Sequence, residues 1–151
     1  HLSDRRQRQM CIRDRTWTIP AKRMKMKEKH VIPLSDQSLK VLHQVKALGN
    51  DGLIFPGMRT GRPMSDMTMS KLVKELGYPV DIHGFRTSFR TWVQEQTNNA
   101  GEVAERALAH KVTNKVEAAY ARSDLFEKRR KLMDTWASYL NNEPAKVVQL
   151  R

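Results

Sequence analysis

The stretch DIHGFRTSFRTW, residues 81–92, combines a helical apolar pattern with two cationic side chains. Phe85 and Phe89 lie four residues apart, which places them on one face of a helix and predicts that this face is buried. Packing requires the phenylalanines but neither His83 nor Arg86, which are three residues apart and can share another face. Because free N–H groups at the start of a helix favour an anion, we expect a negatively charged partner there.

The composition predicts a polyanionic partner. The chain has 151 residues, enough for one domain with a core, a formal net charge of +12 and a pI of about 10.2. A surplus of this size is typical of nucleic-acid binding, with an anionic membrane surface as the second choice. No apolar run approaches the ~20 residues that span a bilayer, and no signal peptide is visible, so we expect no membrane partner. The single cysteine excludes an intramolecular disulfide and suits a reducing cytosol.

The first fifteen residues, HLSDRRQRQMCIRDR, show no helical or strand period. Their QMCIRDR string resembles translated sequencing-adaptor DNA, so we expect residues 1–15 to be non-native or disordered. A genuine basic arm that contacts DNA is the alternative. The segment holds five arginines and two aspartates, so the rest of the chain still carries +9, and Cys11 receives no role. We assign residues 16–140 to the folded domain and residues 141–151 to a C-terminal tail.

The segment TWTIPAKRMKMKEKHVIPL, residues 16–34, predicts a β-hairpin. Trp17 opens one strand, and Val31 and Ile32 belong to the next. Between them, methionines alternate with lysines over residues 24–29, which is the two-residue period of a strand. We therefore expect a small sheet near the N-terminus.

Helical periods and capping signals predict six helices after the hairpin. Ser35 and Ser65 are the expected N-caps of the first two helices, and Gly49 and Gly77 their ends. The fold class is therefore α+β, mainly helical, with the small hairpin or sheet packed on a bundle of about five to six helices. The helices are expected over residues 35–48, 65–76, 83–93, 102–110, 114–122 and 124–140.

Helical spacing also predicts which side chains are buried and which are exposed. In the last helix, Asp124 and Glu127 are expected to form a capping pair. The run EKRRK, residues 127–131, is expected to be an exposed helix face. His30 and His43 have no partner at useful spacing. The residues expected to point inward from the second helix are Met69, Leu72, Val73 and Leu76.

Five polar residues are left unexplained by helix packing: Lys25, His83, Arg86, His110 and Tyr120. No cluster of carboxylates or cysteines accompanies them, whereas zinc and magnesium sites usually need such ligands. We therefore expect no metal and no other cofactor. Cations with a phenol suit work on a phosphodiester, because a tyrosine can act as nucleophile and an arginine can hold the non-bridging oxygens. Histidine and lysine can move the protons.

Three short motifs resemble the signature boxes of the tyrosine recombinases, the phage integrase family. They are HGFR at 83–86, LAHK at 108–111 and AAYAR at 118–122. The segment WTIPAKRMK followed by HVIPLS is similar to the hairpin of the prophage-integrase branch. The resemblance covers about residues 17–140. No single box is specific, but their order and the ten-residue interval from His110 to Tyr120 are.

The resemblance implies a role for each of the five residues. Tyr120 matches the nucleophile that forms a 3′-phosphotyrosine and frees a 5′-hydroxyl. Arg86 matches the second of two arginines that neutralise the phosphate, and His83 matches the residue that assists proton transfer. His110 matches the histidine that hydrogen-bonds the scissile phosphate, and Lys25 matches the hairpin lysine that protonates the leaving 5′-oxygen. Neither ATP nor a metal is required, because the bond energy stays in the phosphotyrosine.

One departure from the family pattern concerns its first arginine, which lies in a helix upstream of the hairpin. Arg13 and Arg15 lie too close to the hairpin to match it. The separate core-binding and arm-binding domains of the family are not matched either. We therefore expect residues 16–140 to be a tyrosine recombinase catalytic domain that lacks its N-terminal part. Losing one charge-stabilising donor costs roughly a hundred- to thousandfold in rate, so we expect this fragment to be inactive alone.

The resemblance also implies partners and a location. The substrate is double-stranded DNA at attachment sites, the intact protein acts as a homo-tetramer, and an excisionase or DNA-bending protein can assist it. The location is the bacterial cytoplasm, at the nucleoid. Two alternatives remain open: a non-catalytic DNA-binding remnant, and a type IB topoisomerase-like enzyme. The residues expected to contact DNA are Arg23, Lys27, Lys29, Arg59 and Arg62.

Overall fold

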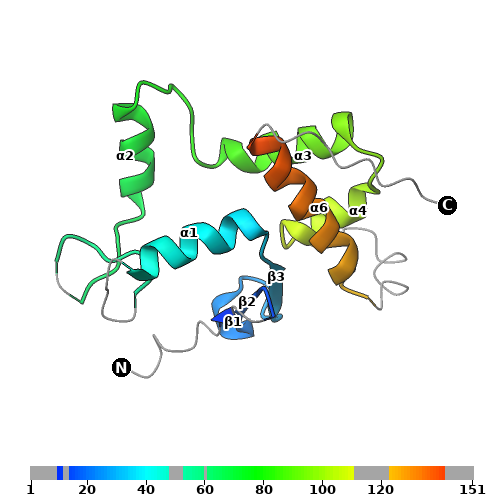
Figure 1. Cartoon of the computed structure of the whole chain (residues 1–151), viewed down its shortest axis with the longest axis horizontal. Helices are drawn as coiled ribbons and strands as arrows, with labels where there is room; N and C mark the ends of the chain where they lie inside the picture. Colours follow the sequence, from blue (N-terminus) through cyan, green and yellow to red (C-terminus); the bar gives the residue numbers. More distant parts are fainter. Residues whose placement is uncertain (1–9, 12–13, 48–52, 60, 111–122, 142–151) are drawn as a thin grey trace. The chain divides into compact units, whose positions relative to one another are not determined.

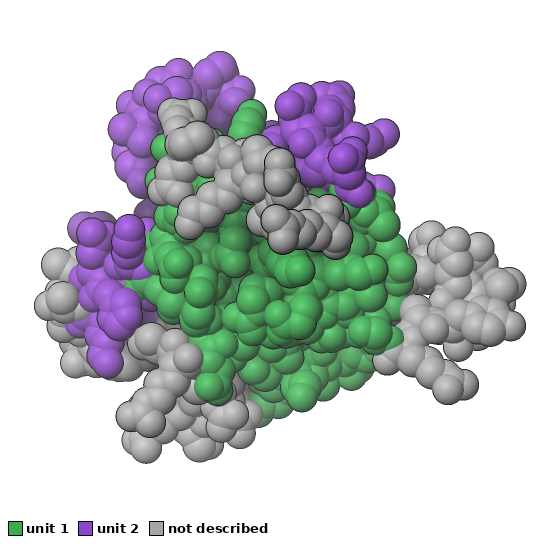
Figure 2. Space-filling view, turned by 45° about the vertical axis from the view of Figure 1, so that its right-hand side comes forward, with its two compact units in different colours: residues 1–39, 99–151 green, residues 40–98 purple. Residues whose placement is uncertain are grey.

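The structure is a computed structural model that describes residues 10–11, 14–47, 53–59, 61–110 and 123–141. The chain divides into two compact units, coloured separately in Figure 2. The first unit consists of residues 1–39 and 99–151, and the second consists of residues 40–98. The first unit is thus built from the two ends of the chain.

The sheet of the first unit contains three antiparallel strands in the order β1-β2-β3 (Figure 1). These strands are β1 (Met10–Cys11), β2 (Thr16–Ile19) and β3 (His30–Pro33). In the register between β2 and β3, Trp17 lies opposite Ile32. The β-branched and aromatic residues of both strands suit this half-buried sheet, and the predicted hairpin is confirmed.

The connection between β2 and β3 differs from the prediction. It forms a short 3₁₀ helix, η2 (Ala21–Arg23), followed by turns, and the strand period predicted for residues 24–29 is wrong. The backbone N–H of Lys27 donates to the carbonyl oxygen of Met24 at 3.0 Å, which bends the chain. Lys27 itself has a φ of 57°, in the left-handed region. Local turn hydrogen bonds therefore replace strand pairing here.

Helices α4 (Gly101–Ala107) and α6 (Phe126–Leu140) pack together in the first unit, and α6 also packs against β3. Figure 1 shows α4 and α6 side by side. Apolar residues form most of the buried core between these elements, as helical periods at these positions predict. They are Leu34, Val103, Ala104, Leu132 and Ala137.

The second unit contains α2 (Met67–Glu75), α3 (Gly84–Gln96) and most of α1 (Asp36–Ala47). Ser35 caps α1 as predicted, because the backbone N–H of Ser38 donates to its Oγ at 3.2 Å. Gly77 ends α2 with a φ of 83°, a conformation that glycine adopts without strain.

The predicted inward face of α2 is wrong, because α2 contains no buried residue. Met69, Leu72 and Leu76 are 49%, 52% and 63% exposed. Amphipathic spacing favours an apolar stripe, but it does not say whether another element covers the stripe. On α3 the prediction is half right, because Phe89 is buried and Phe85 is exposed.

The fold class is confirmed: the described residues are mainly helical, with a small antiparallel sheet. The helix expected over residues 114–122 lies outside the described residues. The domain boundaries stay predictions. Within residues 1–15, Met10–Cys11 pairs with β2, and the Arg15 guanidinium forms ion pairs with Asp36 (3.1 Å) and Asp134 (3.5 Å).

Candidate functional site

His83 and Arg86 occupy the first turn of α3. His83 is the N-cap residue, and the backbone N–H of Arg86 donates to its carbonyl oxygen at 3.1 Å. The carboxylate of Asp81 accepts the backbone N–H of His83 at 3.1 Å and so orients the helix start. The side chains of His83 and Arg86 are exposed, and the first turn of the helix contains no acidic residue. This end of α3 therefore exposes the side chains of His83 and Arg86, but its first backbone N–H groups are not free, because they donate to Asp81, Ile82 and His83.

His110 lies just after the end of α4. The backbone N–H of His110 donates to the carbonyl oxygen of Glu105 at 2.9 Å, and the N–H of Ala109 donates to that of Arg106 at 3.1 Å. With Ala109 at a φ of 55°, this is a Schellman motif whose left-handed position is filled by alanine instead of glycine. The imidazole Nδ1 of His110 also pairs with the Glu105 carboxylate at 2.5 Å. These contacts fix both the backbone and the ring of His110.

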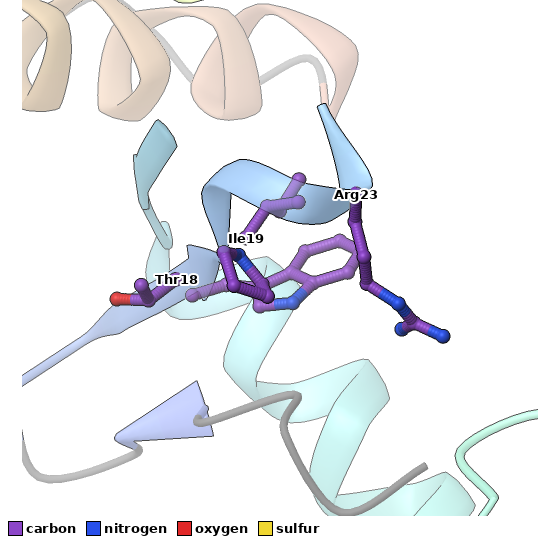
Figure 3. A pocket seen from close by; sticks show the side chains of 5 residues that line it. Thr18, Ile19 and Arg23 are labelled. Atoms are coloured by element: carbon purple, nitrogen blue, oxygen red, sulfur yellow. The ribbon is translucent and has the colours of Figure 1, made fainter. Parts of the chain in front are cut away.

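Lys25 lies in the turn that follows η2, and its side chain is exposed. The three predicted DNA contacts of the same connection, Arg23, Lys27 and Lys29, are exposed as well. A pocket of about 330 Å³ beside this turn is lined by residues 17–20 and Arg23. Figure 3 shows the Arg23 side chain pointing away from the labelled Thr18 and Ile19. The connection therefore exposes these four cationic side chains.

Arg59 and Arg62 lie in a tight loop of the second unit, and both are exposed. The backbone N–H of Gly57 donates to the carbonyl oxygen of Arg62 at 2.7 Å, and Arg62 N–H donates to that of Arg59 at 3.1 Å. A Cβ at Gly57 would lie 2.7 Å from the backbone oxygen of Pro63, so this close approach requires glycine. The loop thus presents two arginines on a constrained backbone.

The structure brings two of the five catalytic candidates together, His83 and Arg86, within one helical turn of the second unit. Lys25 and His110 belong to the first unit. Tyr120 lies outside the described residues. The catalytic roles of all five therefore stay predictions.

A buried arginine was missed by the sequence prediction. Arg129, expected on an exposed face, is 1% exposed and donates hydrogen bonds to Val31 and to Asp124. Helical spacing could have predicted this burial, because Arg129 lies three residues before the buried Leu132 on the same stripe of α6.

The expected capping pair of Asp124 and Glu127 is half right. Asp124 accepts the backbone N–H of Phe126 at 3.1 Å, whereas Glu127 pairs with Arg130 instead.

His30 has partners that its sequence neighbours did not reveal. Burial lowers the pKa of His30, and the nearby Arg129 guanidinium lowers it further. The Asp124 carboxylate and a hydrogen bond to the backbone of Ala107 act in the opposite direction. His30 therefore lies, half-buried, in a polar cluster with the buried Arg129 and the exposed Asp124.

The described part of the chain lacks two features. No group of three or more His, Cys, Asp or Glu residues is arranged there to hold a metal ion. No helix within the same residues has the length and apolar character needed to cross a membrane.

Comparison with known proteins confirms the resemblance. The model of the phage integrase family matches residues 6–126. Over 89% of its own length, the chain is 36% identical to the integrase of Enterobacteria phage P4. Over 80% of its own length, it is 41% identical to the prophage integrase IntA of Escherichia coli K12. It is 31% identical to the E. coli prophage integrase IntZ over 87%.

The matched regions cover only part of these relatives. The chain spans 35% of the phage P4 integrase, 30% of IntA and 33% of IntZ, about a third of each. No solved structure matches the chain significantly. Because the family model matches most of its residues, the chain belongs to the phage integrase family.

Proposed function

We propose that the protein carrying this chain is a site-specific DNA recombinase that cuts and rejoins DNA through a 3′-phosphotyrosine. The observation that carries this proposal is the family match over residues 6–126, which contains all five catalytic candidates. The phage P4 relative and IntA, both similar to this chain, are named integrases. In this proposal the chain supplies most of the catalytic domain.

The five residues divide the chemistry of one strand cleavage. The phenol oxygen of Tyr120 attacks the phosphorus, and the bond from phosphorus to the 5′-oxygen breaks. His83 takes the phenolic proton, and Lys25 gives a proton to the leaving 5′-oxygen. Arg86 and His110 donate hydrogen bonds to the non-bridging oxygens, where negative charge increases in the transition state. Attack by the 5′-hydroxyl of another strand reverses these steps and rejoins the DNA.

The placement of the described residues supports these roles. His83 and Arg86 share the exposed start of α3, where the helix dipole favours a phosphate. Lys25 lies in an exposed turn among other cations, and the Schellman motif holds the backbone of His110. The net charge of +12 suits a partner that carries one negative charge per phosphate.

The proposal includes the assembly and its location. The partner is double-stranded DNA at two attachment sites, bound by four copies of the intact protein. An excisionase or a DNA-bending protein assists, and the reaction takes place in the cytoplasm at the nucleoid. Arg15 is not assigned the role of the family's first arginine, because its guanidinium pairs with Asp36 and Asp134.

The test is a covalent-trapping assay on the intact protein, after the source gene has been sequenced upstream of codon 16. The protein is incubated with DNA from its source and denatured with detergent, and DNA that stays attached to protein is recovered and sequenced. We expect attached DNA from the wild type and none from Tyr120→Phe, because phenylalanine has no oxygen to attack phosphorus. The control Tyr78→Phe removes the hydroxyl of an exposed tyrosine and should leave the yield unchanged.

The basic charge also favours a second candidate, a DNA-binding protein without catalysis. Salt-sensitive binding without a covalent product in the intact wild type would establish this candidate and refute the recombinase. A type IB topoisomerase-like enzyme shares the phosphotyrosine. It would relax a supercoiled plasmid that lacks paired sites, whereas the proposed recombinase would not.

A further inference from the structure

We propose that Arg129 is a positioning residue for strand cleavage, which holds two chain segments directly, and a third through the neighbouring His30, in the arrangement that the reaction needs. This inference rests on the proposed function. Each of the three segments is close in sequence to one catalytic candidate: Lys25, His110 or Tyr120.

The contacts of Arg129 join two distant parts of the chain. Its Nη1 donates to the carbonyl oxygen of Val31 in β3 at 2.7 Å. Its Nε donates to the carbonyl oxygen of Asp124 at 2.8 Å, and its Nη2 donates to the Asp124 carboxylate at 2.9 Å. Two of the three acceptors are backbone oxygens, so the planar guanidinium fixes the backbone of both segments.

A third segment joins through His30, the residue before Val31. His30 forms a hydrogen bond to the backbone of Ala107, the last residue of α4. We name the five residues Arg129, Asp124, Val31, His30 and Ala107 the Arg129 cluster. The cluster therefore connects β3, the end of α4 and the start of α6.

The positions of the cluster along the chain relate it to the catalytic candidates. His30 follows Lys25 by five residues, and Ala107 precedes His110 by three. Asp124 follows Tyr120 by four residues. Each segment that the Arg129 cluster connects is therefore within five residues, along the sequence, of a catalytic candidate.

A purely stabilising role does not explain an arginine at this position. Arg129 is 1% exposed, and burying a charged group in a core costs more than burying a leucine of similar reach. Leu125, directly before α6, is also held at a φ of 54°, in the sparsely populated left-handed region. Such a conformation persists only where its surroundings impose it, and it clusters at functional sites. Directional hydrogen bonds and an imposed backbone are features of a segment that must be placed accurately.

The expected effect of losing the cluster is a defect in cleavage and not in binding. A displacement of about 1 Å at a reacting group can cost roughly a hundredfold in rate. None of the residues predicted to contact DNA belongs to the Arg129 cluster, so DNA affinity should be retained.

The experiment compares variants of the intact protein on a nicked DNA substrate that traps the covalent product after one turnover. The thermal midpoint of each variant is measured first. Cleavage and DNA affinity are then measured on the same samples, at a temperature well below that midpoint. We expect Arg129→Met to lower the cleavage rate by roughly a hundredfold while its DNA Kd stays within about twofold. Arg129→Lys, which keeps the charge but not the planar fork, should fall between Arg129→Met and the wild type. The matched control is Arg130→Met, which removes the neighbouring arginine on the same helix and should cleave at the wild-type rate.

A second variant keeps the test decisive if Arg129→Met does not fold. Asp124→Asn retains the backbone acceptor and removes only the charge of the carboxylate. Because the Asp124 side chain is half-exposed, the variant should fold. We expect it to lower the cleavage rate by about tenfold. Folded variants that bind DNA like the wild type and also cleave like it would overturn the inference. So would a loss of cleavage that only follows a loss of folded protein or of DNA affinity. If the wild type itself forms no covalent product, the proposed function fails instead.

Discussion

Two neighbouring arginines on α6 show how much the position of a single residue matters. Arg129 is 1% exposed and satisfied by Val31 and Asp124, whereas Arg130 pairs with the exposed Glu127 at 3.5 Å. Burial lowers the pKa of Arg129, and the Asp124 carboxylate raises it again. A guanidinium stays charged under these conditions, so Arg129 keeps its positive charge at every ordinary pH. Residue type alone does not distinguish the two arginines.

The first prediction at this scale concerns His30, whose pKa is lowered in the folded protein from the ordinary 6.5. As the pH falls through 6.5, the unfolded chain takes up a proton at this position and the folded protein does not. The free energy of unfolding should therefore decrease on acidification. His30→Gln should flatten this decrease, as measured by urea unfolding between about pH 7.5 and pH 5.5.

The control for this prediction is His43→Gln. His43 is exposed on α1, so its replacement should leave the pH dependence unchanged. An equal pH dependence in His30→Gln and the wild type would show that the half-buried imidazole does not contribute.

Helix ends are the elements in which sequence and structure agree best. Ser35 caps α1 and Gly77 ends α2, as their residue types predict, because capping depends on local hydrogen bonds. The end of α4 is an exception, since its left-handed position is occupied by Ala109 at a φ of 55°. A side chain at this position is strained, because its Cβ crowds the backbone.

The second prediction follows from this strained helix end. Ala109→Gly should raise the free energy of unfolding by about 0.5–1 kcal/mol, because glycine relieves the strain but also loses more chain entropy on folding. Chemical denaturation measures the change. Ala107→Gly, within the same helix, should instead lower the free energy of unfolding by about 0.5–1 kcal/mol. If both variants were destabilised alike, the left-handed position would not be the source of the effect.

The charge of the whole molecule and its family membership both favour a polyanionic partner such as DNA. A formal charge of +12 favours a polyanion, and the phage integrase model matches residues 6–126. The cations predicted to contact DNA, in the β2–β3 connection and in the loop of Arg59 and Arg62, are all exposed. Exposed arginines and lysines are what phosphate contacts require.

The third prediction uses the salt dependence of DNA binding by the intact protein. If Arg59 and Arg62 each neutralise a phosphate, replacing both by glutamine should reduce the slope of log K against log salt by about two. The matched control replaces Lys71 and Lys74, exposed lysines of α2, by glutamine and changes the net charge equally. An equal change of slope in both double variants would indicate a diffuse effect of charge and would remove the loop from the interface.

The sequence alone predicted the features that depend on neighbouring residues. The strands at Trp17 and Ile32, the helix after His83 and the caps at Ser35 and Gly77 follow from local periods and hydrogen bonds. The order of the short motifs also indicated the family, which the family match confirms.

Tertiary structure decided which surfaces are covered and which charges are buried. The stripe of α2 with Leu72 has the same apolar spacing as the stripe of α6 with Leu132, yet only the latter is buried. One partner of Arg129, Val31, likewise lies in β3, 98 residues away in the chain, and no local pattern encodes such a contact. Burial depends on what packs against a face, and that is a property of the folded chain and not of the segment.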